Sequence, residues 1–284
     1  QSGNSNVAVG VAALYNTGNR SNLAAVGDSA LYNNGVGAVN PYEATANSAF
    51  GSKALYANTT GYYNTATGSN ALKNNTTGIQ NTANGTGALF TNTTGGANTA
   101  TGLNALFQNS TGNNNTAVGN FTLPNNSSGN NNTGTGTGAL STNTTGNNNT
   151  AAGTGSLFSN TTGYSNVAIG TEALYKNTVR TNLVAVGDSA LYNNGTGASF
   201  PFESINNTAV GSKALYANTK GNDNAATGFN SLYTNTTGYS NTANGSFSLY
   251  ANTIGRNNTA IGSSSLSSNI TGHHNTAVGI QSDR

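Results

Sequence analysis

The apolar residues of this chain recur at a fixed spacing that fits no helical face. In the stretch NTATGSNALKNNTTGIQ, from Asn64 to Gln80, an alanine follows the first asparagine by two residues and a leucine follows it by eight. The same arrangement is repeated at once in NTANGTGALFTNTTGGA and in NTATGLNALFQNSTGNN. Short apolar stretches bounded by glycine and asparagine are typical of strands and turns. The pattern therefore predicts a repeat of short strands joined by corners.

The repeat extends over the whole chain. With the asparagine of N-T-A-x-G as position zero, sixteen units follow one another at intervals of 17 residues, except for two intervals of 24. Two seven-residue insertions, near 35–46 and 195–206, therefore interrupt an otherwise constant register. Self-similarity at a fixed short period is the sequence signature of stacked repeat architectures.

A longer period is superimposed on the first. Nine units and one insertion form a block of 160 residues, 6–165, and 166–284 is an incomplete second copy of that block. We refer to these as the first and second blocks. Because the register is constant apart from the insertions, we expect residues 1–284 to form one continuous domain.

Four positions of the unit hardly vary, and their chemistry predicts their roles. Position +4 is glycine in all sixteen units, as expected at a corner that needs positive φ or a close backbone approach. Positions +2 and +8 are alanine and leucine in fifteen units each, which indicates inward-facing residues. Position +11 is nearly always asparagine, followed by Thr-Thr-Gly or a relative. This is turn chemistry and predicts an opposite corner with a second left-handed glycine.

Seventeen residues suffice for one coil of a β-solenoid, which stacks on the next coil about 4.8 Å away. Stacking places like residues on like, so leucines form a ladder inside and asparagine amides bond to one another at a corner. One coil buries only an alanine and a leucine, so stability must accumulate through the interfaces between coils. The sequence predicts an all-β, single-stack, β-roll-like solenoid of sixteen 17-residue coils with two 7-residue insertions.

Charge and composition narrow the list of partners. Only 6% of the residues are charged, and the nine basic and seven acidic side chains are scattered, so nothing resembles a nucleic-acid-binding stripe. No apolar run is long enough to span a membrane as a helix. Disordered polar tracts have a similar composition, but they lack a regularly recurring apolar residue. We therefore expect a folded chain with no nucleic-acid partner and no membrane span.

Residues with catalytic or metal-binding chemistry are sparse. His273 and His274 are the only histidines, and there is no cysteine, so metal-ligand spacing is not recognisable. Asp28 and Asp188 follow the corner glycine in just two units, whereas a calcium β-roll carries aspartate in every coil. The sequence offers no candidate residues for a catalytic triad or for a catalytic pair of carboxylates either. The sequence predicts no catalytic residue, no metal, no cofactor and no enzymatic activity.

The repeats resemble those of known fibres. N-T-A-V-G and N-V-A-I-G, at Asn115 and Asn166, resemble the head repeats of trimeric autotransporter adhesins. The longer unit N-T-A-x-G-x-x-A-L-Y-x-N-T-T-G resembles repeats of bacteriophage tail fibres and bacterial surface fibres. The resemblance covers residues 4–280 and implies a β-solenoid fibre. The coils of those adhesins are shorter, so the resemblance does not settle whether three chains associate.

The insertions are the candidates for specific contacts. Their sequences, GVGAVNPYEATA and GTGASFPFESIN, share a glycine, a proline and an aromatic residue followed by glutamate. Excursions on one face of a solenoid often form its binding face. The alternative is a solvated loop braced by local ion pairs. The candidate lateral-contact residues are Pro41, Tyr42, Glu43, Phe50, Pro201, Phe202 and Glu203.

The outer surface offers two further features. Apolar residues at +3 and aromatic residues at +9, such as Val9 and Tyr15, form exposed patches for another chain, unless +3 is half-buried and the aromatic side chain covers a corner. Asn58, Asn75 and equivalent residues begin N-x-S/T triplets, which arise by accident in an Asn/Thr ladder. A surface glycan as ligand or modification is not established by these triplets.

We expect a structural protein, a subunit of a self-assembling extracellular filament. The chain begins without methionine, which suggests a removed secretory signal, and its two ends complete one coil in register across a two-residue gap. This predicts head-to-tail polymerisation by edge pairing, with lateral bundling or a trimer as further possibilities. The alternatives are the shaft of a trimeric adhesin or phage tail fibre and, less favoured, an ice-binding solenoid. The predicted assembly residues are Gln1, Ser2, Gly3, Asn4, Ser5, Ser282, Asp283 and Arg284.

Overall fold

The computed structural model describes residues 3–283, and in this range every regular element is a three-residue β-strand. The chain divides into two compact units, Gln1–Gly138 with Thr142–Thr145 and Ala139–Ser141 with Gly146–Arg284. The strands of the first unit are β1 (Val7–Val9), β2 (Ala24–Val26), β3 (Ser48–Phe50), β4 (Thr65–Thr67), β5 (Thr82–Asn84), β6 (Thr99–Thr101), β7 (Thr116–Val118) and β8 (Thr133–Thr135). Those of the second are β9 (Thr150–Ala152), β10 (Val167–Ile169), β11 (Val184–Val186), β12 (Thr208–Val210), β13 (Ala225–Thr227), β14 (Thr242–Asn244), β15 (Thr259–Ile261) and β16 (Thr276–Val278).

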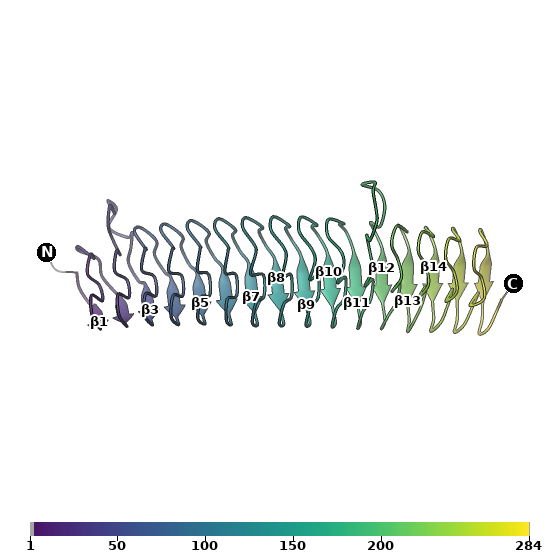
Figure 1. Cartoon of the computed structure of the whole chain (residues 1–284), viewed down its shortest axis with the longest axis horizontal. Coiled ribbons are helices and arrows are strands. Elements are labelled where there is room, and N and C mark those ends of the chain that lie inside the picture. Colours follow the sequence, from purple (N-terminus) through teal and green to yellow (C-terminus); the bar gives the residue numbers. More distant parts are fainter. Residues whose placement is uncertain (1–2, 284) are drawn as a thin grey trace. The chain divides into compact units, whose positions relative to one another are not determined.

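Within each unit the strands pair in parallel, in chain order and in register. β1 pairs with β2 and β7 with β8, while in the second unit β9 pairs with β10 and β15 with β16. In Figure 1 the coils of each unit lie side by side, each contributing one arrow to the sheet. Each sequence repeat thus forms one coil, and each coil contributes one strand, which defines a parallel β-solenoid. The predicted all-β solenoid is confirmed, and among residues 3–283 there is no helix.

The strand residues alternate between the core and the surface. In β4 and β5 the central alanine is buried and both flanking residues are exposed. A pleated strand turns successive side chains to opposite faces. The predicted inward +2 and outward +3 positions are therefore confirmed.

The leucines at +8 form the core, but in an unexpected backbone conformation. Leu106 is fully buried and has a φ of 51°, in the left-handed region that leucine rarely adopts. Its N–H donates to the carbonyl of Thr122 in the next coil, at 3.0 Å. The turn at leucine thus keeps the coil-to-coil hydrogen bonding while directing the side chain inward.

Two glycines recur in the coils, one at +4 in every coil and one at +14 in most, and they have different roles. Gly102, at +4, has a φ of 131°, and a Cβ there would lie 2.5 Å from the carbonyl oxygen of Gly119. Gly95, at +14, lies outside the left-handed region, so the predicted second left-handed glycine is wrong. A Cβ on Gly95 would instead lie 2.4 Å from the oxygen of Gly112 and 2.5 Å from the Asn92 amide oxygen. Close packing, not φ, requires the second glycine.

Two ladders of buried asparagine side chains run from coil to coil. The predicted ladder at +11 is confirmed, since Asn92 Nδ2 donates to Asn75 Oδ1 at 2.7 Å and to Gly95 O at 2.9 Å. A second ladder at position zero was not predicted. There Asn98 donates through its backbone N–H and its Nδ2 to Asn81 Oδ1, at 3.0 and 3.1 Å. The +11 asparagines of the N-x-S/T triplets are buried between coils, apart from half-buried Asn269, so glycans on the buried ones are incompatible with this fold.

Removing one amide from the +11 ladder is expected to be destabilising. Asn92→Ala deletes two donated bonds and the acceptor for Asn109 Nδ2, 2.8 Å away, which leaves buried polar groups unpaired. We expect the free energy of unfolding to fall by about 2–4 kcal/mol. The matched change Asn120→Ala removes an exposed amide and should cost less than about 1 kcal/mol. Denaturant unfolding measures both, and equal losses would contradict a buried ladder.

Candidate functional site

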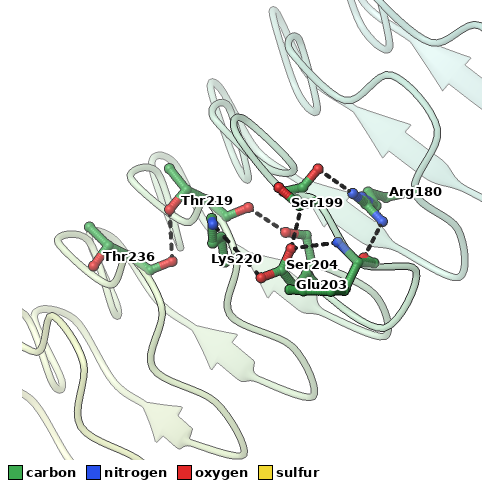
Figure 2. Close-up of polar contacts among 9 residues, drawn as sticks. Arg180, Ser199, Glu203, Ser204, Thr219, Lys220 and Thr236 are labelled. Atoms are coloured by element: carbon green, nitrogen blue, oxygen red, sulfur yellow. Dashed lines mark hydrogen bonds and ion pairs between the residues drawn. The ribbon is translucent and has the colours of Figure 1, made fainter.

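The insertions near 35–46 and 195–206 leave their coils as loops (Figure 1), which we call the first and second excursions. The second excursion is attached to its coil by a buried arginine. Arg180 occupies the +14 position, where most coils have glycine, and its Nη1 and Nη2 donate to the carbonyls of Phe200 and Ala198 at 2.7 and 2.8 Å (Figure 2). The backbone of the adjacent coil makes room for this side chain at Gly195, where the excursion begins. A Cβ at Gly195 would lie 3.1 Å from Arg180 Cγ. The arginine therefore fills the gap that the excursion creates.

A glutamate closes the same excursion from its other end. Glu203 Oε2 accepts hydrogen bonds from the backbone N–H groups of Ser199 and Phe200, at 2.6 and 2.9 Å. The Phe200 N–H is the largest cause that holds the pKa of the Glu203 carboxyl below its ordinary value. The other oxygen, Oε1, lies 3.9 Å from Lys220 Nζ. The carboxylate thus acts as a cap for two loop amides.

The first excursion is braced in the same way. Arg20 Nη1 and Nη2 donate to the carbonyls of Asn40 and Ala38, at 2.5 and 2.7 Å. Glu43 Oε2 accepts from the N–H groups of Val39 and Asn40, at 2.7 and 3.0 Å. In residues 3–283 the one ion pair is Lys220–Glu203. Bonds from charged side chains to the backbone therefore hold both loops, and in the described part of the chain only the second loop has an ion pair in addition.

Acid should loosen the second excursion. Because the folded-state pKa of Glu203 is lowered, its contribution is present above the ordinary carboxyl value of about 4.3 and is lost as pH falls through the folded pKa. We expect the amide proton shifts of Ser199 and Phe200 to titrate together in NMR spectra, at a pH below the ordinary carboxyl pKa. Glu203→Gln should abolish this titration. Amide shifts that stay flat from pH 5 to 2, or that titrate equally in Glu203→Gln, would be inconsistent with the cap.

The candidate lateral-contact residues fall in two places. Tyr42 and Phe202 are 57% and 63% exposed on the excursions, next to exposed Pro41 and Pro201. Glu43 and Glu203 cap their loops as described. Phe50 is 44% exposed but lies on β3, opposite Val26 of β2, and so belongs to the sheet surface. Contact of these residues with another chain stays a prediction.

The aromatic residues at +9 form stacked columns, which the sequence analysis missed. In the second unit, rings from Phe158 to Tyr250 stack with centroids 5.0–5.4 Å apart and planes within 18° of parallel. These rings are half-buried, and burial is the main cause that raises the pKa of Tyr192. The constant offset of +9 was the available signal, because equal offsets lie above one another in a stack. The column members are Phe158, Tyr175, Tyr192, Tyr216, Tyr233 and Tyr250.

The predicted assembly residues are described in part, since Gln1, Ser2 and Arg284 lie outside the described residues. Asn4 donates its N–H to Ser21 Oγ at 3.0 Å, and Asn4 O accepts from Asn22 N at 3.0 Å. Ser282 O accepts from Leu266 N at 2.9 Å, and Ser268 Oγ lies 3.4 Å from Asp283 Oδ2. Gly3 passes so close to Arg20 O that a Cβ would not fit, and Ser5 has a φ of 59°. Asn4, Ser282 and Asp283 thus contact the adjacent coil of their own chain.

Other classes of site have little support in the part of the chain that the structure describes. Residues 3–283 contain no group of three or more His, Cys, Asp or Glu side chains placed to hold a metal ion. The same range has no helix with the length and apolarity needed to cross a bilayer. No family model, no curated protein and no solved structure matches the chain. Its lack of enzymatic activity stays a prediction.

Proposed function

We propose that the chain is a structural protein, a subunit of an extracellular filament or surface fibre that assembles head to tail by β-edge pairing. The observation that carries the proposal is the equivalence of the coils. Most coils present the same leucine, asparagine and strand positions to the coil before them and the coil after them, as the ladder of Asn75, Asn92 and Asn109 does in the first unit. A coil of this pattern is therefore complementary to another coil of the same pattern, including one in a second copy of the chain.

The outermost described strands offer the edges for this assembly. Within residues 3–283, β1 pairs with β2 alone and β16 with β15 alone. Unpaired strand edges recruit other chains, because their N–H and C=O groups are ready to extend the ladder. Val7 and Val9 of β1 are 55% and 57% exposed, and Val278 of β16 is 68% exposed. Apolar side chains at both edges favour pairing over solvation.

Blocking one edge tests the proposal. A polar helical cap appended after Arg284 should abolish growth of the 284-residue chain into filaments, measured by light scattering and negative-stain microscopy. The matched control carries the same helical segment inserted at Gly37, where a Cβ would meet nothing within 4 Å, and it should still assemble. Monomers of the uncapped chain at high concentration, or unchanged filaments of the capped chain, would contradict edge pairing.

The shaft of a trimeric adhesin or tail fibre is the second candidate. The observation that favours it is a set of exposed apolar side chains on the outer face of the strands, such as Phe50 at 44%, in register with Val26, in the first unit and Ile169 at 43%, in register with Val186, in the second. Exposed apolar residues in rows are suited to lateral contact between chains. Analytical ultracentrifugation of the capped chain separates the two candidates, because a trimer persists when edge growth is blocked.

A further inference from the structure

A tyrosine that packs against the first excursion is replaced by an asparagine beside the second, where there is a pocket. In the first block the ring of Tyr62 meets the ring of Tyr42 edge-on, with centroids 5.7 Å apart. The residues 160 positions later are Asn222 and Phe202. Asparagine is too short to fill the space of a tyrosine ring, and beside Phe202 there is an open pocket of about 440 Å³. The lining residues are Phe202, Glu203, Lys220, Asn222, Thr237 and Tyr239.

Two aromatic rings in the lining are held in place by neighbours. Phe202 is 63% exposed and stacks on Phe200, with centroids 5.5 Å apart and planes 5° from parallel. Arg256 Nη1 donates to the Tyr239 hydroxyl at 3.0 Å, and the guanidinium lies 5.7 Å from the centre of that ring. The first-block counterparts of Tyr239 and Arg256 are Ile79 and Gly96, so this support exists only in the second block.

The polar groups of the lining supply both donors and acceptors. Glu203 is fixed by two backbone N–H groups, and its Oε1 is directed toward Lys220 (Figure 2). The Lys220 side chain is 39% exposed, and its first-block counterpart is Thr60. Asn222 and Thr237 add an amide and a hydroxyl. One carboxylate and one ammonium make the lining neutral overall, so it favours a ligand without charge.

We propose that this pocket binds one pyranose ring of a neutral glycan. A pyranose has C–H faces that pack on aromatic rings, and around its edge it has hydroxyl groups that both donate and accept hydrogen bonds. Small-molecule sites combine apolar and aromatic walls with a few placed polar groups in the same way. The proposal stands independently of filament assembly, because every lining residue lies in one unit of a single chain.

Saturation-transfer difference NMR on the 284-residue chain tests the proposal. The probes are the methyl β-pyranosides of glucose, galactose and N-acetylglucosamine, with methyl β-glucuronide as a charged comparison. We expect transfer to the ring hydrogens of at least one neutral probe. Asn222→Tyr, which restores the first-block residue, and Phe202→Ala should each weaken its affinity at least tenfold. Lys220→Thr, also a first-block residue on an exposed position, should weaken it about threefold without affecting the fold.

The first excursion provides the matched control. Tyr42→Ala removes the equivalent exposed ring from the other loop, so it should leave the affinity unchanged. The proposal is wrong if no neutral probe receives saturation, if Tyr42→Ala and Phe202→Ala weaken binding equally, or if Asn222→Tyr binds as the parent chain does. Preferential binding of the glucuronide would also contradict it, because Lys220 alone would then account for recognition.

Discussion

Leu106→Asp is expected to lower the free energy of unfolding by more than about 4 kcal/mol, the largest single effect among the predicted substitutions. The Leu106 side chain is fully buried within the first unit, and its backbone adopts a left-handed conformation that directs it into the core. An aspartate there either buries an unpaired carboxylate or stays protonated and loses the apolar contacts. Thermal and denaturant unfolding of the 284-residue chain measures the loss.

The same coil provides the control for this substitution. Leu103 lies three residues earlier and is 41% exposed, so Leu103→Asp introduces the same charge on the surface. We expect this variant to change the free energy of unfolding by about 0.5 kcal/mol or less. Equal melting temperatures for Leu106→Asp and the parent chain would mean that the leucine ladder faces solvent.

Gly102→Ala is expected to cost about 3–6 kcal/mol, the second large effect. At a φ of 131° the backbone of Gly102 is strained for any other residue, and the added Cβ would lie 2.5 Å from the Gly119 oxygen and 2.6 Å from its carbonyl carbon. The clash is with backbone, which cannot give way without separating the two coils. Amide exchange should therefore accelerate most on either side of this interface.

Gly18 provides a comparison in which neither a φ near 131° nor a backbone clash is present. It also has positive φ, at 58°, but a Cβ there would meet nothing within 4 Å. Gly18→Ala should therefore cost only about 1 kcal/mol, the ordinary cost of a left-handed residue with a side chain. If Gly18→Ala and Gly102→Ala proved equally destabilising, neither the φ of 131° nor close packing between coils would be the reason for glycine at +4.

The period of the sequence predicts the fold because stacking turns equal offsets into contacts. Gly102, Leu106 and Asn92 could each be placed, as corner, core and ladder, from position alone. The left-handed φ of Leu106 could not be predicted in this way. An apolar residue at a fixed position indicates that its side chain faces the core, but it does not indicate the backbone conformation. Glycine at +14 was misassigned for a related reason. Positive φ and close approach require the same residue, and only coordinates tell them apart.

The candidate site was predictable in location but not in its contacts. The two intervals of 24 residues locate the excursions, and the recurrence of Arg20 at Arg180 indicates a shared role. Which atoms the guanidinium meets depends on the loop backbone, whose carbonyls compete with carboxylates as acceptors. The pocket beside Phe202 could not be predicted either. It depends on how the short side chain of Asn222 lies against the excursion, and the sequence does not give the conformation of that loop.

We propose the coil as the unit of assembly, both within the chain and between chains. The most direct test is electron cryomicroscopy of filaments grown from the 284-residue chain, with the orientation of the strand spacing as the readout. Head-to-tail stacking predicts a spacing of about 4.8 Å along the filament axis, because the strands then run across it. Filaments in which this spacing lies perpendicular to the axis, or a chain that forms no filaments at all, would contradict the account.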